Sequence, residues 1–236
     1  MNQQEIIRFE NVTREYGYGD HTLKALNSVS FSINEGEFVV ILGPSGAGKS
    51  TLLNLLGGMD FATSGKIIVD GQNIVGLNDD KLTEYRAANV GFVFQFYNLI
   101  PTLTAIENIA LTKKIVKNPL DAGEVLSLVR LADHANQFPA QLSGGEQQRV
   151  SIARAVAKNP TMLLCDEPTG ALDSETGIIV LTMLQEMSRK YGKTVIIVTH
   201  NTVLADCADK VIRIRNGKIH GITENSEPKA VGEVNW

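Results

Sequence analysis

A glycine-rich segment that ends in a lysine and a serine is the first part of the sequence whose residue types could do chemistry. It fits the pattern G-x-x-x-x-G-K-[ST], and its residues are Gly43, Pro44, Ser45, Gly46, Ala47, Gly48, Lys49 and Ser50. In this pattern backbone N–H groups wrap phosphates, Lys49 would reach the terminal phosphates and Ser50 would hold magnesium. The alternative is a glycine turn without a ligand. A preceding apolar run and following leucines at helical spacing favour phosphate binding, because the motif lies between a strand and a helix.

Two adjacent carboxylates form the second candidate site. Asp166 and Glu167 follow the apolar residues 162–165, so a metal-bound phosphate could meet them at the end of a buried strand. Asp166 suits an outer position around magnesium, and Glu167 suits a general base that orients and polarises water. An acidic pair that merely ends a strand is the alternative, which the nearby phosphate-binding motif disfavours.

A third segment places two glycines at the start of a predicted helix. Its residues are Leu142, Ser143, Gly144, Gly145, Glu146, Gln147, Gln148 and Arg149. Ser143 and Glu146 match a capping box, which alone predicts only a capped helix. A cap does not need two adjacent glycines, whereas bare backbone at a positive helix end lets an anion approach closely. One chain would then carry two phosphate-binding helix ends.

The apolar pattern predicts the elements that must position these groups. Alternating or continuous apolar runs predict strands at residues 6–12, 29–33, 38–42, 66–69, 90–94, 161–166 and 194–199. Helical spacing predicts helices at residues 49–56, 81–88, 105–116, 123–131 and 176–191. Residues 211–222 predict a hairpin on an Asn216-Gly217 turn. The predicted fold class is α/β, with one domain over residues 1–225, a helical insert at about 96–142 and a flexible polar tail at 226–236.

Length and composition exclude several classes of protein. The chain has 236 residues, or one large domain, and its 22 Lys plus Arg against 26 Asp plus Glu give a net charge of −4. This charge disfavours non-specific binding of nucleic acid. No apolar run approaches the roughly 18 residues of a membrane helix, and no secretory signal is visible. Cys165 and Cys207 have no disulfide or metal spacing, so a reducing cytosol fits best and a membrane role would need a partner.

The three segments together resemble the motifs of ATP-binding cassette (ABC) ATPases. The family signature LSGGQ appears at residues 142–146 with Glu146 in place of Gln, and Gln95, Asp173 and His200 fall where the family has its Q-loop, D-loop and switch histidine. The resemblance covers nearly the whole chain. It implies a P-loop NTPase core with a mainly parallel sheet, an N-terminal antiparallel β subdomain and an inserted α-helical subdomain. ATP and Mg²⁺ are the cofactors that it implies.

The resemblance also implies roles for single residues. Gln95 would touch the metal or the attacking water and join the core to the helical insert, although a surface glutamine after a strand is the alternative. His200 would contact the γ-phosphate, whereas in isolation it fits a satisfied histidine at a strand end. With Glu167, these two are the catalytic candidates. Tyr16 resembles the family's adenine-stacking aromatic residue, and Tyr18 is its competitor.

By the same resemblance, two copies of the chain share each ATP. Residues 43–51, which include Thr51, would bind the triphosphate in one copy. The Ser143–Gly145 helix end of the other copy would complete the shell around the γ-phosphate, and Asp173 belongs to the same nucleotide-binding set. We therefore expect a head-to-tail homodimer that closes on ATP and loses this preference after hydrolysis.

A narrower resemblance, to the macrolide-efflux and lipoprotein-release group (MacB/LolD-like), rests on residues 94–104 and 166–173. Tyr97 stands where that group often has Phe, and Ala171 where it often has Asn. It implies a permease partner at the cytoplasmic face of the cell membrane, with an adaptor reached through the permease, and most simply efflux of macrolides or antimicrobial peptides. Lipoprotein release, a cell-division role and a non-transport role are the alternatives. Phe96, Tyr97, Leu99 and Ile100 would form the docking surface, or would instead pack into their own subdomain.

Two rival classes share part of this pattern. A soluble kinase or GTPase would also use Lys49 and Ser50, but the sequence has no Asn-Lys-x-Asp motif for guanine recognition. The glycine-bearing helix end at residues 143–145 would have no function in either class. A cassette protein that acts on DNA or ribosomes usually carries two cassettes or a long coiled-coil insertion. The sequence contains neither.

Overall fold

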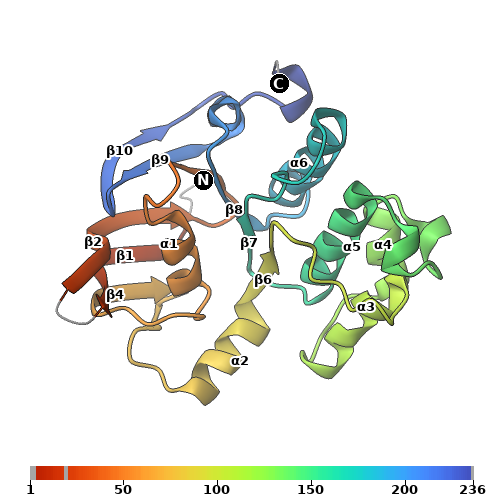
Figure 1. Cartoon of the computed structure of the whole chain (residues 1–236), viewed down its shortest axis with the longest axis horizontal. Coiled ribbons are helices and arrows are strands. Elements are labelled where there is room, and N and C mark those ends of the chain that lie inside the picture. The colour runs from red at the N-terminus through yellow and green to blue at the C-terminus, as the bar shows by residue number, and fades with distance from the viewer. Residues whose placement is uncertain (1–3, 19–20, 235–236) are drawn as a thin grey trace.

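The computed structural model describes residues 4–18 and 21–234, which form two sheets and a group of helices (Figure 1). The strands are β1 (Glu5–Tyr18), β2 (His21–Asn34), β3 (Phe38–Leu42), β4 (Ser64–Val69), β5 (Gln72–Asn73), β6 (Val90–Val93), β7 (Met162–Asp166), β8 (Thr194–Thr199), β9 (Lys210–Arg215) and β10 (Lys218–Glu224). The helices are α1 (Lys49–Leu56), α2 (Asp79–Asn89), α3 (Ala105–Ala110), α4 (Ala122–Leu128), α5 (Gly144–Ala157) and α6 (Ser174–Arg189). Short 3₁₀ helices are η1 (Leu111–Lys114), η2 (Ala132–His134), η3 (Pro139–Gln141), η4 (Thr202–Cys207) and η5 (Val231–Glu233).

The six-stranded sheet is buried on both faces. Its order is β10-β9-β3-β8-β7-β6, and every neighbouring pair is parallel except β9 with β10. Successive side chains of a strand point to opposite faces, so in β3 Phe38 and Val40 enter one hydrophobic core while Val39 and Ile41 enter the other. This double burial explains the continuous apolar runs in the sequence, and the predicted α/β class with a mainly parallel sheet is confirmed.

Four strands within residues 5–73 build a second, antiparallel sheet in the order β2-β1-β4-β5. Its two long strands extend well beyond the predicted residues 6–12 and 29–33, because backbone pairing continues where the apolar alternation stops. Glu15 pairs with Lys24 and Tyr16 with Leu23 in that extension. The hairpin thereby carries Tyr16 out of the core towards the start of α1.

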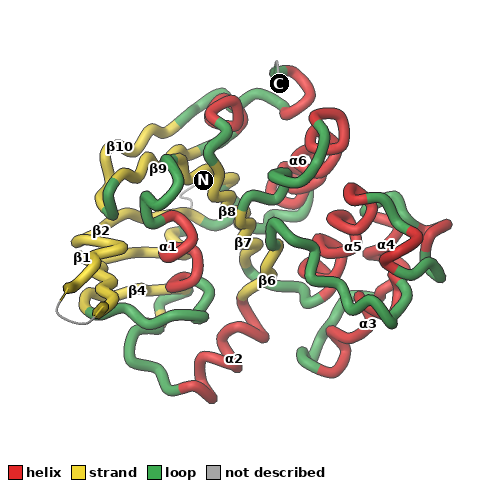
Figure 2. The backbone as a smooth tube through the Cα atoms, viewed as in Figure 1, coloured by secondary structure: helices red, strands yellow, loops and turns green. Residues whose placement is uncertain are grey.

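Residues 96–142 contain helices and turns and no strand. Figure 2 shows α3, α4 and α5 gathered on one side of the molecule, away from the antiparallel sheet. The helix predicted over residues 105–116 ends earlier, at Ala110, and continues as η1. The buried Thr112 hydroxyl donates to the Ile109 carbonyl oxygen at 2.9 Å, and such side-chain bonds compete with α-helical geometry.

The described part of the C-terminal tail, up to residue 234, is packed against α6. Val231 in η5 is fully buried, and the Gln185 side-chain amide donates to the Lys229 carbonyl oxygen at 2.9 Å. One apolar side chain and a buried amide thus connect this short polar segment to α6. None of the described helices is both long and apolar enough to cross a membrane.

Candidate functional site

The loop between β3 and α1, residues 43–48, has a backbone shape that requires glycine. Gly46 and Gly48 have φ angles of 75° and 105°, in the left-handed region that side chains disfavour. A Cβ atom at Gly48 would collide with the Ala25 carbonyl oxygen, and one at Gly43 with that of Ile214. Lys49 is buried, and its ammonium donates to the Gly43 and Pro44 carbonyl oxygens at 2.8 and 3.1 Å. The loop therefore curves around a single positive charge at a helix N-terminus, an arrangement suited to bind phosphates.

Tyr16 and this loop face the same cavity, which has a volume of about 470 Å³. Its lining includes Tyr16, Ala25, residues 46–51, Asn216 and Gly217. Ser50 and Thr51 are thus at the cavity wall, as is the aromatic ring proposed for the base. Gly43 and Pro44 instead border a neighbouring hollow that His200 also lines, and Ser45 is exposed. The side chain of Tyr18, the competing aromatic residue, lies outside the described structure.

The structure brings Ser50 and Asp166 together from opposite parts of the sequence. The Ser50 hydroxyl donates to Asp166 Oδ1 at 3.3 Å. Burial raises the pKa of the Asp166 carboxyl, the bond from Ser50 opposes this effect, and the adjacent Glu167 adds to it. A hydroxyl and a carboxylate oxygen are the hard donors that Mg²⁺ prefers. Among the described residues, no group of three or more His, Cys, Asp and Glu could hold a metal ion.

Glu167 is held in a defined orientation at the end of β7. Its φ angle of 44° is unusual for a residue other than glycine. The Thr199 hydroxyl donates to Glu167 Oε2 at 2.9 Å, and His200 Nδ1 lies 3.0 Å from Oε1. The His200 side chain is 73% exposed, so both the partnered histidine at a strand end and the proposed contact with the γ-phosphate stay open. Two neighbouring strands therefore place the carboxylate and the imidazole side by side.

Gln95 lies near this group without bonding to its predicted metal partners. Its side chain is exposed, and a Cβ atom at Gly170 would lie 3.1 Å from Gln95 Nε2. Among the described residues Gln95 makes no hydrogen bond to Ser50 or Asp166. The structure thus places it beside the turn that follows Glu167.

The second glycine pair lies at the N-terminus of α5, where the predicted capping box is present. The Glu146 backbone N–H donates to Ser143 Oγ at 3.3 Å, and the Ser143 N–H donates to Glu146 Oε2 at 2.7 Å. The Ser143 hydroxyl also donates to Glu146 Oε2, at 2.8 Å, and the two bonds that the carboxylate accepts from Ser143 lower the pKa of Glu146. A Cβ atom at Gly145 would collide with the Thr176 side chain. Asp173 caps the adjacent α6 by accepting from the Thr176 N–H at 2.9 Å, so two helix N-termini lie side by side here.

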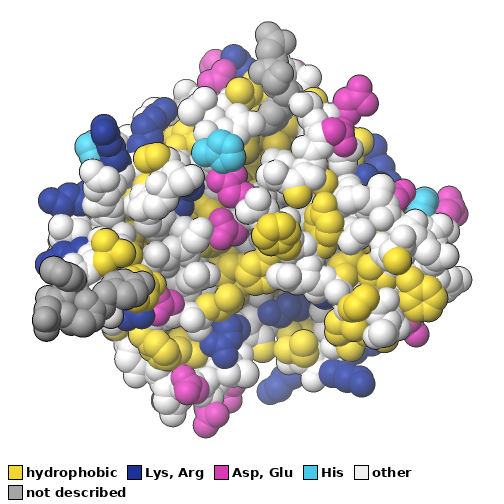
Figure 3. Space-filling model, viewed as in Figure 1, with side chains coloured by type: hydrophobic (Ala, Val, Ile, Leu, Met, Phe, Trp, Pro, Cys, Tyr) yellow, Lys and Arg dark blue, Asp and Glu magenta, His cyan; other side chains and the backbone are white. Residues whose placement is uncertain are grey.

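The two glycine-bearing helix ends occupy separate places on the chain. Neither residues 143–145 nor Asp173 lines the cavity that Tyr16 and residues 46–51 form. In the view of Figure 3, acidic side chains and a histidine lie near the centre of the face, and hydrophobic side chains spread from there over the helical insert. The two helix ends that the sequence predicts to bind phosphate therefore lie apart on the described chain.

Two buried side chains that support the site were not identified from the sequence. Thr199 fixes Glu167, and its position directly before His200 was the available signal. The fully buried Gln148 donates through Nε2 to the Phe94 and Pro168 carbonyl oxygens at 3.2 and 2.8 Å. It thereby ties α5 to the residue before Gln95 and the residue after Glu167. No local pattern distinguishes this glutamine from its neighbour Gln147.

Comparison with known proteins identifies the class. The family model described as ABC transporter matches residues 26–170. A Thermotoga maritima protein named as an uncharacterized ABC transporter ATP-binding protein is 44% identical over 224 residues, which cover 93% of this chain and 95% of that protein. The chain belongs to the ABC transporter family, as its ATP-binding ATPase domain.

Further relatives add detail. The chain is 45% identical over 239 residues to the Mycoplasma genitalium ABC transporter ATP-binding protein MG065; the match covers all of this chain but only 51% of that protein. The chain thus spans about half the length of this curated relative. The macrolide export ATP-binding/permease protein MacB of Brucella melitensis is 44% identical over 219 residues, 91% of this chain and 34% of that protein.

One solved structure bears on the chemistry. It is a dimeric post-hydrolysis state of the ATP-binding cassette MJ0796, from Methanocaldococcus jannaschii, bound to ADP and Pi. It matches with a TM-score of 0.85 and 42% identity, covering 93% of this chain and 98% of that one. The predictions of an ABC ATPase and of ATP as the bound nucleotide are confirmed.

Proposed function

We propose that two copies of this chain form a head-to-tail dimer that binds two ATP molecules at its interface and thereby drives a partner permease. One observation carries the proposal: the phosphate loop and the Ser143–Gly145 helix end lie apart on the same chain. Each is suited to bind phosphate oxygens, yet the helix end does not line the cavity beside the phosphate loop. A second copy in the opposite orientation supplies the missing half. The dimeric MJ0796 cassette supports this arrangement.

In this proposal each residue of the site has one task. Lys49 and the loop N–H groups bind the phosphates, and Ser50 and Asp166 hold Mg²⁺, which when bound neutralises charge on the phosphates. Glu167 accepts a hydrogen bond from the attacking water and takes its proton. Thr199 and His200 keep the Glu167 carboxylate in place, and His200 is exposed enough to reach the γ-phosphate. Gln95, directly before the helical insert, contacts the same water.

The permease is proposed to dock where the helical insert meets the core. Phe96 is 72% exposed and Ile100 40% exposed, so both are free to contact a partner. The other two predicted docking residues, Leu99 and Tyr97, make contacts within the chain. Leu99 packs against the core, and the Tyr97 carbonyl oxygen accepts from Arg154 at 3.1 Å.

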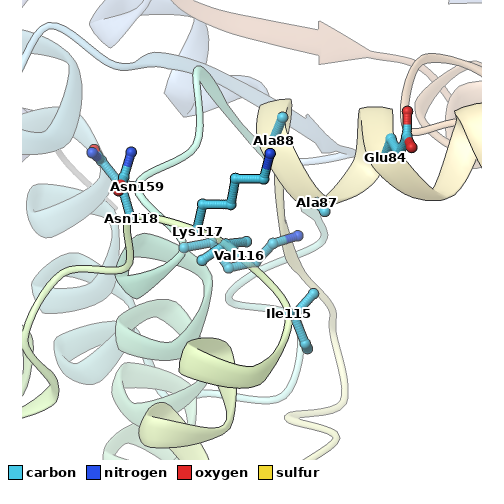
Figure 4. Close-up of a pocket in the computed structure, with 9 residues that line it drawn as sticks. Glu84, Ala87, Ala88, Ile115, Val116, Lys117, Asn118 and Asn159 are labelled. Atoms are coloured by element: carbon cyan, nitrogen blue, oxygen red, sulfur yellow. The ribbon is translucent and has the colours of Figure 1, made fainter.

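A cavity of about 580 Å³ lies between α2 and residues 115–118 of the helical insert. Figure 4 shows Glu84, Ala87 and Ala88 of α2 on one side of it, with Ile115 and Val116 of the insert facing them. The mixture of apolar walls with lysine and glutamate at the rim suits an amphipathic helix of a membrane protein. Docking there would couple movement of the insert to the permease.

Efflux of macrolides or antimicrobial peptides is the proposed work of the assembly, at the cytoplasmic face of the cell membrane. Support comes from the similarity to MacB, whose name joins an ATP-binding part to a permease. A periplasmic or extracellular adaptor would then act through the permease.

Mixing two inactive variants tests the shared site. Ser143→Arg blocks the helix end, and Lys49→Ala blocks the phosphate loop, so either variant alone should have little ATPase activity. An equimolar mixture can form a pair with one intact site and one doubly damaged site. We expect activity of the mixture to rise well above the mean of the two separate variants. A mixture no more active than its components would contradict the contribution of residues from two copies.

A further inference from the structure

Asp60 gathers two side chains of β1 into one cluster. The Tyr16 hydroxyl donates to Asp60 Oδ2 at 2.6 Å, and Arg14 donates to the same carboxylate from Nε at 3.0 Å and from Nη2 at 2.6 Å. The Arg14 guanidinium also lies over the Tyr16 ring, 4.3 Å from its centroid. The Arg14 and Asp60 side chains are only 22% and 17% exposed, so water screens these bonds less than surface ion pairs.

Tyr16 also lines the cavity beside the phosphate loop, whereas neither Arg14 nor Asp60 is among the lining residues of that cavity. The Arg14 guanidinium covers one face of the ring, so the other face is the apolar surface that a base could use. The hydroxyl is bonded to Asp60. A swing of the ring about the Cα–Cβ bond would break this charge-assisted hydrogen bond.

Asp60 itself is anchored to the helix that begins at the phosphate loop. The Met59 N–H donates to the Asn54 carbonyl oxygen of α1 at 2.8 Å, one residue before Asp60. On the other side, the Thr63 N–H donates to the Thr13 carbonyl oxygen at 2.8 Å. Asp60 is thus fixed both to α1 and to β1. The distance from the ring to the phosphate loop is set by a short, rigid connection.

We propose that Asp60 is a positioning residue for the nucleotide base. It holds the Tyr16 ring at a fixed place relative to Lys49, and Arg14 packs against one face of the ring. The base can then contact Tyr16 while the phosphates contact Lys49. The inference rests on the proposed stacking of the base on Tyr16. Ordering the ring before binding removes a cost that a mobile side chain would impose on affinity. Asp60 should therefore affect the base and leave phosphate binding alone.

Calorimetry with two probes tests this role. ADP carries a base, whereas inorganic tripolyphosphate carries only phosphates, and both are titrated with Mg²⁺ into the full chain. Asp60→Ala should lower the affinity for ADP by about three- to tenfold, because one side chain then has to be ordered on binding. Tripolyphosphate affinity should stay within about twofold. Asp80→Ala, which removes an exposed carboxylate of α2, is the matched control and should change neither.

A second set of variants separates the tether from a general loss of structure. Tyr16→Phe keeps the ring and removes the hydroxyl, so it should lower the affinity for ADP as much as Asp60→Ala does. The double variant should bind ADP no more weakly than either single variant. Asp60→Asn keeps an acceptor for the hydroxyl and should recover much of the affinity. The proposal would be overturned if Asp60→Ala lowered the affinities for ADP and tripolyphosphate equally, or if it left the affinity for ADP unchanged. Tyr16→Ala tests the platform separately: if it leaves ADP affinity unchanged, the base does not stack on Tyr16.

Discussion

At the scale of single residues, the Glu167 carboxylate shows how the site controls orientation. Its left-handed backbone turns the side chain back towards β8, where Thr199 and His200 bond one oxygen each. A general base works only when its lone pair points at the proton it removes. The hydroxyl of Thr199, itself buried, is therefore a positioning group for the proposed reaction.

Thr199→Val removes that hydroxyl while keeping the side-chain shape. We expect turnover at saturating ATP to fall by about 10- to 100-fold, because a hydrogen bond to a charged group contributes about 1.5–3 kcal/mol. The KM for ATP should change little, since the phosphate loop is untouched. Steady-state ATPase assays measure both quantities.

Thr194→Val, at the other end of β8, is the matched control. The Thr194 hydroxyl accepts from the Gly36 N–H at 3.0 Å, far from Glu167. This variant should lose stability and keep its turnover. Equal turnover losses in the two variants would show that strand β8 as a whole, and not the Thr199 hydroxyl, sets the rate.

At the scale of elements, two helices carry the same capping box for different purposes. Ser143 with Glu146 caps α5, and Thr104 with Glu107 caps α3. Only the α5 cap is followed by two glycines that leave its N-terminus bare. The comparison separates what a cap does for stability from what a bare helix end does for a ligand.

Ser143→Ala and Thr104→Ala should therefore differ in activity and agree in stability. Loss of the serine cap should lower the free energy of unfolding by about 1 kcal/mol, and loss of the threonine cap should have a comparable effect. Only Ser143→Ala should also slow ATP hydrolysis. Urea unfolding and ATPase assays on both variants check this; a matching loss of activity in Thr104→Ala would contradict it.

The α5 cap also predicts a pH dependence of stability. Hydrogen bonds from Ser143 lower the pKa of Glu146 in the folded chain, so its contribution is complete above the unfolded pKa of about 4.3 and is lost as the pH falls through the folded value. Relative to Glu146→Gln, the wild-type chain should be more stable at pH 7 by a few tenths to about 1 kcal/mol. This advantage should decline as the pH falls below about 4.3 and should vanish once the pH is below the folded pKa of Glu146.

The same titration has a simple control. Glu227→Gln changes an exposed glutamate outside the helices and should give no such pH-dependent difference. Glu146→Gln also removes the charge that faces His134 Nε2, at 3.3 Å, and Arg149, so the cap is tested by the acid limb of the curve. An advantage that persists undiminished to the lowest pH would refute the assignment.

At the scale of the whole molecule, the parallel sheet decides which parts of the chain meet. The C-terminal ends of β3, β7 and β8 bring the phosphate loop, the acidic pair and His200 to one edge. The start of α5 lies at a different place, beside the start of α6. We therefore propose that one copy of the chain suffices to bind a nucleotide and that the reaction needs two copies.

Dilution tests this requirement. If hydrolysis needs a pair, the rate per chain should fall as the chain is diluted, and Glu167→Gln should accumulate ATP-bound dimers because the step that reopens them is blocked. ATPase assays over a wide range of chain concentration, with light scattering on the variant, measure both effects. A constant rate per chain down to concentrations at which only monomers exist would sink the shared-site proposal.

Much of the fold could be predicted from the sequence because its signals are local. Strands β3 and β8 and helix α1 have the predicted bounds, since burial on both faces or on one helix stripe leaves a clear pattern over a few residues. The strands of the β1–β2 hairpin were predicted too short, because their ends are held by pairing with each other and not by burial. The contacts of the tail with α6 could not be predicted, because α6 is distant in sequence; the flexibility of residues 226–236 stays a prediction.

The sequence by itself determined the phosphate loop, the acidic pair and the capped glycine helix, because each is a contiguous segment whose backbone shape follows from its own residue types. Only the tertiary structure decided which distant side chains support them. Thr199 lies 32 residues from Glu167 and Asp60 lies 44 from Tyr16 along the chain. The physical reason is that such contacts depend on how strands and loops are ordered in space, and that order arises from the burial of the whole chain.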